Sequence, residues 1–484
     1  QADRHTIETI GIPSMVLMER AALGVVQMIE KEVSRISSVL VVCGSGNNGG
    51  DGYAIARLFH LKGYQVFIYF VGNEERRSEE NLLQKKIAEY YQIPVKQELE
   101  EQEYSVIIDA VFGTGLNRDI CGKYAETLEL LNRMKGYKVA VDMPSGISDE
   151  TGKVMGTAFR ADITVALGFL KRGHVMISGN PYVGKVVTVD IGIHEDAFEK
   201  DETYTYCYEF QDFQQRFPKR KAQSHKGTYG KVLLIVGSQG MAGAAILCAR
   251  AAYMTGAGLV QIYTHEDNRI IIQESLPEAM VTTYQSYDAE QLRNLLAWAD
   301  VVGIGCGLGM TETARRIVEH TIKNTAKMCV VDADALNLLA NNMAILETGN
   351  QAIVLTPHMK EMARLLSCDL GDLIANKVQS LSDFIKQYSV TCVLKDARTL
   401  VGKAEQPFFL NMTGNCAMAK GGSGDVLCGI ISGILAQGAS PYEGACLGVY
   451  LHGMAGDLSM KRKGQYSVLA GDIVENIGEV LKKI

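Results

Sequence analysis

The chain has 484 residues, of which 47% are hydrophobic and 21% are charged, and its formal net charge is −7. A chain of this length predicts two globular domains, and its acidity argues against a protein that binds nucleic acid through bulk positive charge. No apolar run reaches the roughly 18 residues of a membrane span, and the N-terminal residues lack the apolar stretch of a secretory signal. We therefore expect a cytoplasmic protein with neither a nucleic-acid partner nor a membrane partner.

The 11 cysteines occur singly, without a C-x-x-C pair, and their number is odd. Most of them lie in apolar surroundings, as Cys43, Cys248 and Cys329 do. We expect buried free thiols in a reducing compartment rather than a disulfide framework or a zinc framework.

In the first part of the chain, apolar runs alternate with amphipathic segments. The pattern predicts a helix over 5–31 with a turn at 11–13, strands at 38–43, 65–71, 106–110, 138–142, 163–167 and 186–190, and helices at 52–62 and 124–135. Apolar strands that alternate with helices are typical of a parallel sheet covered on both faces. The functional loops of such a sheet follow the carboxyl ends of its strands.

Residues 194–222 are charged and aromatic and show little strand pattern, so we interpret them as a connection between two domains. Beyond them we predict strands at 231–236, 259–263, 301–304, 329–332, 352–355 and 391–395, and helices at 242–255, 311–323, 333–341, 358–367, 371–387, 424–437 and 441–459. The two halves carry different loop motifs and are not repeats. We place the boundary between residues 211 and 212, with an α/β domain on each side.

Three predicted strand ends of the first domain carry polar loops that contain glycine. These loops are NNGGDG at 47–52, DAVFGTGL at 109–116 and DMPSG at 142–146. A parallel sheet brings such loops to one edge, where glycines let backbone N–H groups approach an anion. The helix that we expect to begin near Gly52 adds the positive end of its dipole. The pattern matches neither the dinucleotide fingerprint nor a Walker A motif.

The same loops supply oxygen ligands and a second carboxylate. Asn48, Asp109 and Ser145 offer an amide oxygen, a carboxylate and a hydroxyl, a set that suits a monovalent cation better than zinc. Asp142 is available for proton transfer at the same edge. An Asp at a strand end also often caps the following turn, so a structural role for each carboxylate remains open.

Four motifs, IPSMVLMERAA, NNGGDGYAIAR, DAVFGTGL and DMPSG, together resemble the epimerase domain of the bifunctional NAD(P)H-hydrate repair enzymes, the YjeF-type family, over about residues 1–195. The resemblance implies a Rossmann-like three-layer domain that epimerises hydrated NADH or NADPH at C6. It also implies a potassium ion bound by Asn48, Asp109 and Ser145, and an acid–base role for Asp142. The implied substrate contacts are Asn47, Asn48, Gly49, Gly50, Asp51, Gly113, Thr114, Gly115, Leu116, Asn117, Arg118, Asp119 and Asp142.

The strongest local signal of the second domain is NCAMAKGGSGDVLCGIISGILAQG at 415–438. A glycine-rich loop enters a long apolar helix that we expect to start near Gly424, and Asp425 lies in its first turn. Backbone N–H groups at a helix start stabilise developing negative charge, and an adjacent Asp can accept a proton. This arrangement is typical of ribokinase-like small-molecule kinases. The alternative is that Asp425 only complements the helix dipole.

Other loops of this domain are compatible with a nucleotide site. They are the glycine loop and small-residue helix at 238–260, GIGCGLG at 303–309, LTPHMKEMARL at 355–365 and LKDART at 394–399. His358 lies at a strand-to-helix turn, where a histidine is commonly a cap, so we assign it binding only. The chain has no Walker A motif, and any chemistry on a nucleotide would be of the non-P-loop kind.

The segments SHKGTYGKVLLIVGS, GMAGAAILCARAA, GAGLV, TPH and GSGDVLCGII resemble the ADP- or ATP-dependent NAD(P)H-hydrate dehydratase domain over about residues 212–484. The resemblance implies a ribokinase-like α/β domain with Asp425 as the base and with magnesium on the phosphates of ADP. The implied hydrate contacts are Ala244, Gly309, His358 and Asp425, and the implied nucleotide contacts are Lys395, Asp396, Ala397, Arg398, Thr399 and Gly424. The chain departs from the family pattern at Asp396, which replaces a glycine and adds a charge.

The combined interpretation is a two-domain metabolite-repair enzyme. It would interconvert the R and S hydrates of NADH and NADPH and would dehydrate the S form at the expense of ADP, giving AMP and phosphate. The alternative is a ribokinase-like small-molecule kinase fused to a non-catalytic binding domain. We expect the hydrate and an adenine nucleotide as small-molecule partners, and a homo-oligomer.

Overall fold

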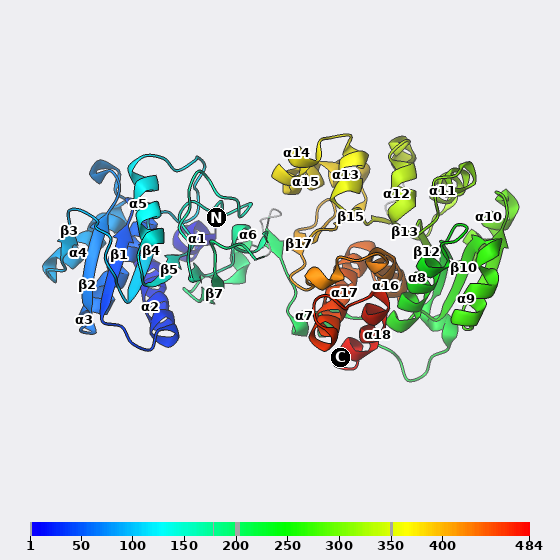
Figure 1. Ribbon diagram of the computed structural model, residues 1–484, viewed down its shortest axis with the longest axis horizontal. Coiled ribbons are helices and arrows are strands. Elements are labelled where there is room, and N and C mark those ends of the chain that lie inside the picture. The colour runs from blue at the N-terminus through cyan, green and yellow to red at the C-terminus, as the bar shows by residue number, and fades with distance from the viewer. Residues whose placement is uncertain (1, 178, 199–203, 349–351) are drawn as a thin grey trace. The chain divides into compact units, whose positions relative to one another are not determined.

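The computed structural model describes residues 2–177, 179–198, 204–348 and 352–484, and the chain divides into two compact units, Gln1–Asp201 and Glu202–Ile484 (Figure 1). This division, after Asp201, lies N-terminal to the domain boundary that the sequence predicts between residues 211 and 212. Strand β8 (Thr205–Tyr206) pairs with β17 (Phe408–Leu410), and helix α7 (Phe210–Arg216) packs against α17 (Pro441–Lys463), so both belong to the second unit. Residues 199–203 of the expected connection lie outside the described residues.

The first unit contains a seven-stranded parallel sheet in the order β3-β2-β1-β4-β5-β6-β7. The strands are β1 (Ser38–Cys43), β2 (Gln65–Phe70), β3 (Val95–Lys96), β4 (Val106–Ala110), β5 (Tyr137–Val141), β6 (Ile163–Leu167) and β7 (Lys185–Val189). The chain runs outward from β1 on one side and from β4 on the other. The topological switch point, where open α/β sheets bind ligands, therefore lies between the carboxyl ends of β1 and β4.

Helices cover both faces of this sheet. They are α1 (Ala2–Arg4), a π-helix (His5–Ile10), α2 (Ser14–Glu32), α3 (Asn47–Leu61), α4 (Glu79–Tyr90), α5 (Lys123–Arg133) and α6 (Arg172–Val175), with short 3₁₀ turns at Glu74–Arg76 and Glu195–Phe198. Val39 and Val41 of β1 pack into one apolar cluster, and Leu40 and Val42 pack into another. Alternate residues thus face opposite layers, and the expected α/β class with parallel sheets is confirmed.

The second unit contains a ten-stranded sheet in the order β11-β10-β9-β12-β13-β14-β15-β16-β17-β8. Its further strands are β9 (Lys231–Ile235), β10 (Leu259–His265), β11 (Met280–Tyr284), β12 (Val301–Ile304), β13 (Met328–Val331), β14 (Ile353–Leu355), β15 (Thr391–Leu394) and β16 (Leu400–Gly402). Pairing is parallel from β11 to β15 and antiparallel from β15 through β16 to β17. Here the switch point lies between β9 and β12.

The helices of the second unit are α7, α8 (Ala242–Thr255), α9 (Arg269–Ser275), α10 (Ala289–Trp298), α11 (Glu312–Asn324), α12 (Ala333–Leu339), α13 (Met359–Leu366), α14 (Leu370–Ala375), α15 (Lys377–Tyr388), α16 (Ser423–Ala436), α17 and α18 (Ala470–Leu481). Short 3₁₀ turns lie at Lys226–Tyr229, Glu266–Asn268, Met343–Thr348 and Cys416–Met418. The helix predicted over 371–387 is wrong as a single element, because Asn376 leaves the helical conformation between α14 and α15. Among the described residues, no helix has the length and apolar character needed to span a bilayer.

The helix predicted to begin near Gly52 begins at Asn47 instead, so NNGGDG forms the first turns of α3 rather than a loop. A Cβ atom on Gly49 would lie 1.9 Å from the carbonyl oxygen of Gly44, and one on Gly52 would lie 2.7 Å from the Cβ of Ala110. These two glycines permit α3 to pack closely on the ends of β1 and β4. The groups that can face an anion are the backbone N–H groups of the first turn, because helix geometry leaves them without intrahelical acceptors.

Substitution Gly49→Ala tests this close approach. We expect a net loss of about 1–3 kcal/mol, because overpacking against backbone outweighs the better helix propensity of alanine. The matched control is Gly46→Ala, since a Cβ on Gly46 would meet nothing within 4 Å. The single tryptophan, Trp298, lies in the second unit, so its fluorescence reports the unfolding of that unit. In Gly49→Ala, the unfolding midpoint measured by circular dichroism should therefore fall, while the midpoint measured by Trp298 fluorescence stays unchanged. Equal stabilities of the two variants would contradict the packing argument.

Candidate active sites

Asp109, at the end of β4, is joined to Ser145 in the loop after β5. Ser145 donates its backbone N–H to Asp109 Oδ2 at 2.7 Å and its hydroxyl to Asp109 Oδ1 at 2.7 Å, and the Val111 N–H donates to Oδ1 at 3.2 Å. Burial raises the pKa of Asp109 to about 6 although these hydrogen bonds oppose the change. Within the described part of the chain, no lysine or arginine forms an ion pair with Asp109. This carboxylate is therefore buried without a compensating positive charge.

Asn48, in the first turn of α3, lies next to this pair. A Cβ atom on Gly113 would lie 3.4 Å from Asn48 Cγ, and the N–H of the preceding Phe112 donates to Ser145 Oγ at 2.8 Å. The side-chain nitrogen of Asn48 is buried and has no hydrogen-bond partner among the described residues. Rotation of the amide by 180° would exchange this nitrogen for the oxygen, since the two orientations differ only in which atom faces the site. The three predicted ligand residues are thus gathered at one edge.

Asp142 is held by two basic residues that the sequence analysis did not identify, Lys171 and His174. Its Oδ1 accepts a hydrogen bond from Lys171 Nζ and another from the Leu167 N–H at 3.1 Å. His174 Nε2 lies 2.6 Å from the Asp142 carbonyl oxygen, and burial lowers the pKa of His174 to about 4. Neutral His174 therefore donates through Nε2, because its Nδ1 accepts from the Lys171 N–H at 3.0 Å. The sequence feature that could have identified Lys171 is its position shortly after a buried strand.

Asp142 also has a φ of 64°, a left-handed conformation that costs energy for a residue with a side chain. The near-complete burial of Asp51 and then the charge of Asp142 raise the pKa of Asp51 well above its usual range. Asp51 therefore keeps its proton to a higher pH than an ordinary carboxyl group does, while Asp142 is ion-paired with Lys171. Two carboxyl groups in such different environments can serve as an acid and a base at one place.

The predicted substrate loop at 113–119 is more open than this cluster. Thr114, Gly115, Asn117, Arg118 and Asp119 are exposed. The Gly115 N–H donates to Asp149 Oδ2 at 3.4 Å. Contact between this loop and a ligand stays a prediction.

In the second unit, Asp425 lies in the first turn of α16, at the carboxyl edge of the sheet. Burial and then the charge of Asp332 raise the pKa of Asp425 to about 6. Asp332 directly follows β13 and is an additional candidate that the sequence analysis missed, although an acidic residue after an apolar strand was the available signal. Its Oδ1 lies 2.7 Å from Lys395 Nζ, and its buried Oδ2 has no partner among the described residues. A Cβ on Gly424 would lie 3.5 Å from both charged groups.

The predicted nucleotide loop follows β15 and makes its own turn. Asp396 Oδ1 accepts from the Ala397 N–H at 2.7 Å, and Thr399 Oγ1 donates to the Asp396 carbonyl at 3.1 Å. Asp396 Oδ2 pairs with Lys377 Nζ at 3.0 Å, which neutralises the charge that replaces the family's glycine. The Arg398 guanidinium donates to the Met412 carbonyl at 3.3 Å. Asp396 is therefore accommodated within the turn.

His358 is an N-cap, the structural role that the sequence left open. Its Nδ1 accepts from the N–H groups of Lys360 and Glu361 at 3.1 and 3.2 Å, and Glu361 Oε2 accepts from the His358 N–H at 2.8 Å. Its ring is half exposed, with Nε2 3.4 Å from Glu361 Oε1. A binding role for His358 through this nitrogen stays a prediction.

Ala244 and Gly309 lie on the two sides of the switch point between β9 and β12. Gly309 follows β12 in the loop that contains Gly307, and a Cβ on Gly307 would lie 3.0 Å from the Cβ of Ala244 at the start of α8. The Gly309 N–H donates to Asp334 Oδ2 at 2.7 Å. Both residues therefore border the carboxyl edge.

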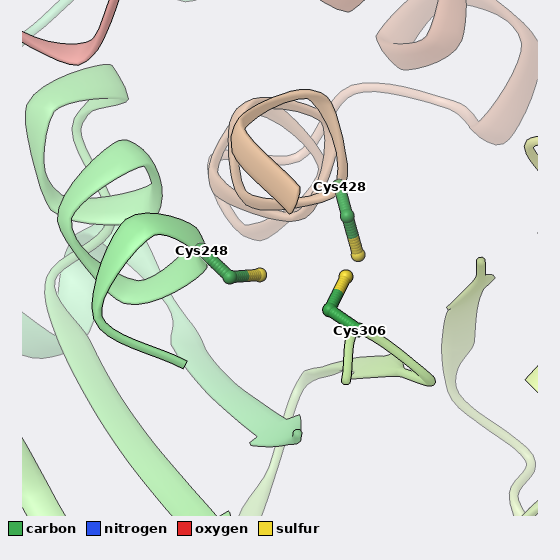
Figure 2. Close-up of side chains that lie close together, drawn as sticks. All are labelled: Cys248, Cys306 and Cys428. Atoms are coloured by element: carbon green, nitrogen blue, oxygen red, sulfur yellow. The ribbon is translucent and has the colours of Figure 1, made fainter. Parts of the chain in front are cut away.

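The cysteines are free thiols, as expected, and seven of them, including Cys43, Cys248 and Cys329, are buried. Three converge at one place: Cys248 from α8, Cys306 from the loop after β12, and Cys428 from α16 (Figure 2). Hydrogen bonds from Cys248 and Cys306 lower the pKa of Cys428 to about 6 although burial opposes the change. Cys306 and Cys428 also interact with the Asp425 carboxylate.

Substitution Lys171→Gln tests the support of Asp142. The loss of a hydrogen bond to a largely buried charged group should destabilise the first unit by about 1.5–3 kcal/mol. The matched control is Lys185→Gln, because Lys185 pairs with Glu32 at the surface, where ion pairs contribute little. Denaturant unfolding followed by circular dichroism measures both variants. If the two behave alike, the Asp142–Lys171 contact does not stabilise the fold.

Each of the two units matches a known protein family. A family described as "NAD(P)H-hydrate dehydratase" matches residues 232–479, and one described as "YjeF-related protein N-terminus" matches residues 14–173. The bifunctional NAD(P)H-hydrate repair enzyme Nnr of Moorella thermoacetica is 34% identical, over 100% of this chain and 95% of its own length. The enzyme of the same name from Escherichia coli is 32% identical, over 99% of this chain and 92% of its own.

Solved structures resemble the second unit. A ribokinase-like superfamily protein from Enterococcus faecalis has a TM-score of 0.52 and 30% identity, and the match covers 58% of this chain and 96% of that one. A Streptococcus mutans protein described as hypothetical has a TM-score of 0.53 and 31% identity, over 57% of this chain and 99% of its own. With the full-length relatives, these matches show that the chain belongs to the family of bifunctional NAD(P)H-hydrate repair enzymes.

Proposed function

We propose that this chain repairs hydrated nicotinamide cofactors in two reactions, one in each unit. The first unit interconverts the R and S hydrates of NADH and NADPH at C6. The second dehydrates the S hydrate to NADH or NADPH at the expense of ADP, with AMP and phosphate as products. The observation that carries the proposal is the pair of carboxylate clusters at the carboxyl edges of the two sheets, Asp51 with Asp142 and Asp332 with Asp425.

In the first unit, Asp51 acts as the acid, because burial raises its pKa, and Asp142 acts as the base. Epimerisation requires that the C6 hydroxyl leaves as water, which gives a cationic iminium ring at the same oxidation level, and that water then adds to the other face. The acid protonates the leaving hydroxyl and the base takes the proton from the incoming water. Lys171 and the strained backbone of Asp142 hold the base in position. The backbone N–H groups at the start of α3 are available to the phosphates of the substrate.

The donor set at Asp109 fits a potassium ion. A carboxylate offers about four lone-pair sites, and the internal hydrogen bonds of Asp109 occupy three of them. A monovalent cation would supply the positive charge that this buried group lacks, and the rotated amide of Asn48 would offer it a further oxygen. Asn48, Asp109 and Ser145 would hold the ion. When bound, it would fix the three loops around the substrate without taking part in proton transfer.

In the second unit, Asp425 accepts the proton of the C6 hydroxyl as that oxygen attacks the β-phosphoryl group of ADP and AMP leaves. The phosphate ester then eliminates phosphate, which restores the reduced nicotinamide ring. Backbone N–H groups at the start of α16 stabilise the charge on the transferred group. Lys395–Thr399 and Gly424 contact the nucleotide, and Ala244, Gly309 and His358 contact the hydrate. Magnesium bound to the phosphates of ADP would offset their negative charge.

The alternative, a small-molecule kinase with a silent first unit, makes different products. The discriminating experiment incubates the chain with pure R or pure S hydrate, with and without ADP, and follows the absorbance of the reduced nicotinamide. The proposed function predicts ADP-dependent return of the cofactor from both epimers, with release of AMP. A stable phosphorylated product would favour the kinase. Turnover of S hydrate alone would favour a non-catalytic first unit.

Substitution Asp425→Asn should lower the ADP-dependent rate by about 10²–10⁴-fold, the usual contribution of a general base. Because a base acts in its deprotonated form, kcat/KM of the parent should fall as pH drops below about 6 and level off above it. The variant should lose this acid limb. Asp383→Asn, on the exposed face of α15, is the matched control and should behave as the parent. An unchanged acid limb in Asp425→Asn would assign the base to another residue.

Substitution Asp109→Ala should empty the cation site and slow the repair of R hydrate, while repair of S hydrate stays normal because it needs only the second unit. The matched control is Asp190→Ala at the end of β7, whose carboxylate is largely exposed. Rates on each pure epimer, measured at several potassium concentrations, separate the two units. The assignment fails if Asp109→Ala repairs R hydrate at the parent rate, or if it loses both activities equally.

A further inference from the structure

Three thiols that the proposed reaction does not use lie together, and two of them interact with the base Asp425. Cys248 projects from α8, Cys306 from the loop after β12, and Cys428 from the second turn of α16 (Figure 2). Their sulfur atoms all lie within 4.8 Å of one another, and all three side chains are fully buried. Three segments that are far apart in sequence therefore place three sulfur atoms at one point.

Rigid backbone holds each of these sulfurs in place. Cys306 lies between Gly305 and Gly307, whose φ values are 122° and 60°, and a Cβ on Gly305 would lie 1.9 Å from the Asp332 carbonyl oxygen. Helices α8 and α16 touch directly, because a Cβ on Gly429 would lie 2.1 Å from the carbonyl oxygen of Cys248. The cluster cannot spread without disturbing the packing of both helices, so it is preorganised.

We propose that Cys248, Cys306 and Cys428 form a binding site for a soft, thiophilic metal ion of the Zn²⁺ or Cd²⁺ class. A zinc–sulfur bond of about 2.3 Å puts two sulfurs of one tetrahedron about 3.8 Å apart, so the thiols need to move by no more than about 1 Å. Three thiolates supply three of the four tetrahedral positions. Their protons leave to solvent as the ion enters, and no oxidant or reductant is required.

The chemistry of the ligands selects the ion. Mg²⁺, which the proposed dehydratase uses with ADP, prefers oxygen ligands in an octahedral arrangement and does not compete for three sulfurs. Asp425 interacts with Cys306 and Cys428 and is only partly buried, whereas the three cysteines are fully buried. We therefore expect an ion to enter past Asp425, and we expect its fourth ligand on that side.

An ion bound at this site changes the surroundings of Asp425, the base of the second reaction, and this step alone rests on the proposed function. A bound ion places positive charge beside Asp425, with which Cys306 and Cys428 interact, and it ties α8, the loop after β12 and α16 together. We expect Zn²⁺ to inhibit the ADP-dependent repair of S hydrate and to leave the interconversion of R and S hydrates in the first unit unchanged.

Binding is tested on the full chain with Co²⁺, which reports sulfur ligands through a thiolate-to-metal charge-transfer absorption. The reduced, chelator-treated protein should develop this band with one equivalent of Co²⁺ and lose it when Zn²⁺ is added. Cys306→Ser and Cys248→Ala should each lower the affinity for Co²⁺ at least tenfold. Cys392→Ser, which changes a fully buried cysteine of β15 outside the cluster, is the matched control and should retain the parent titration.

This readout does not depend on enzymatic activity, so it can fail or succeed independently of the proposed function. Thermal unfolding of each variant without metal shows that it is folded before it is titrated. Absence of the band in the reduced parent protein would overturn the site, as would its equal loss in Cys392→Ser. Thiol counting on the purified protein shows whether two of the three cysteines form a disulfide. Such a disulfide would also overturn the site if its reduction does not restore cobalt binding.

Discussion

Parallel pairing of β1 with β4 and of β9 with β12 is the constraint on which both candidate sites depend. Each pairing joins strands whose chains continue in opposite directions across the sheet, so the loops after them diverge and leave room at the carboxyl edge. Asp109 comes to that edge directly from β4, and Asn48 comes from the helix that follows β1. In the second unit, the same geometry brings Ala244 and Gly309 to the two sides of the opening.

The carboxylates at these edges are stabilised in different ways, and the difference has chemical consequences. Asp142 pairs with Lys171, which follows the neighbouring strand β6, and Asp332 pairs with Lys395, which follows β15, two strands away from β13. Asp109 has only neutral hydrogen-bond donors and is the one for which a cation would supply the missing charge. Asp425 differs from both groups, because burial and then the charge of Asp332 raise its pKa toward the range in which a general base works well.

Close backbone contacts explain several residues that look like ligand contacts in the sequence. Gly49 and Gly429 each bring a helix against a carbonyl oxygen, at distances that no Cβ would tolerate. A glycine-rich motif at a strand end therefore has two functions in this chain. It permits dense packing of a helix on the sheet, and through that packing it fixes the position of the next polar side chain, as with Asn48 and Cys428.

The sequence by itself determined the α/β class, most strand positions and the chemical character of each loop, because buried parallel strands are continuous apolar runs and their ends carry distinctive polar residues. It placed Asp109, Asp142 and Asp425 at strand or helix ends on the same grounds. It did not reveal the start of α3 at Asn47, because glycines disfavour helices unless tertiary packing requires them. Only the tertiary structure paired Lys171 with Asp142 and gathered the three cysteines, because these contacts join segments whose separation along the chain leaves no local pattern.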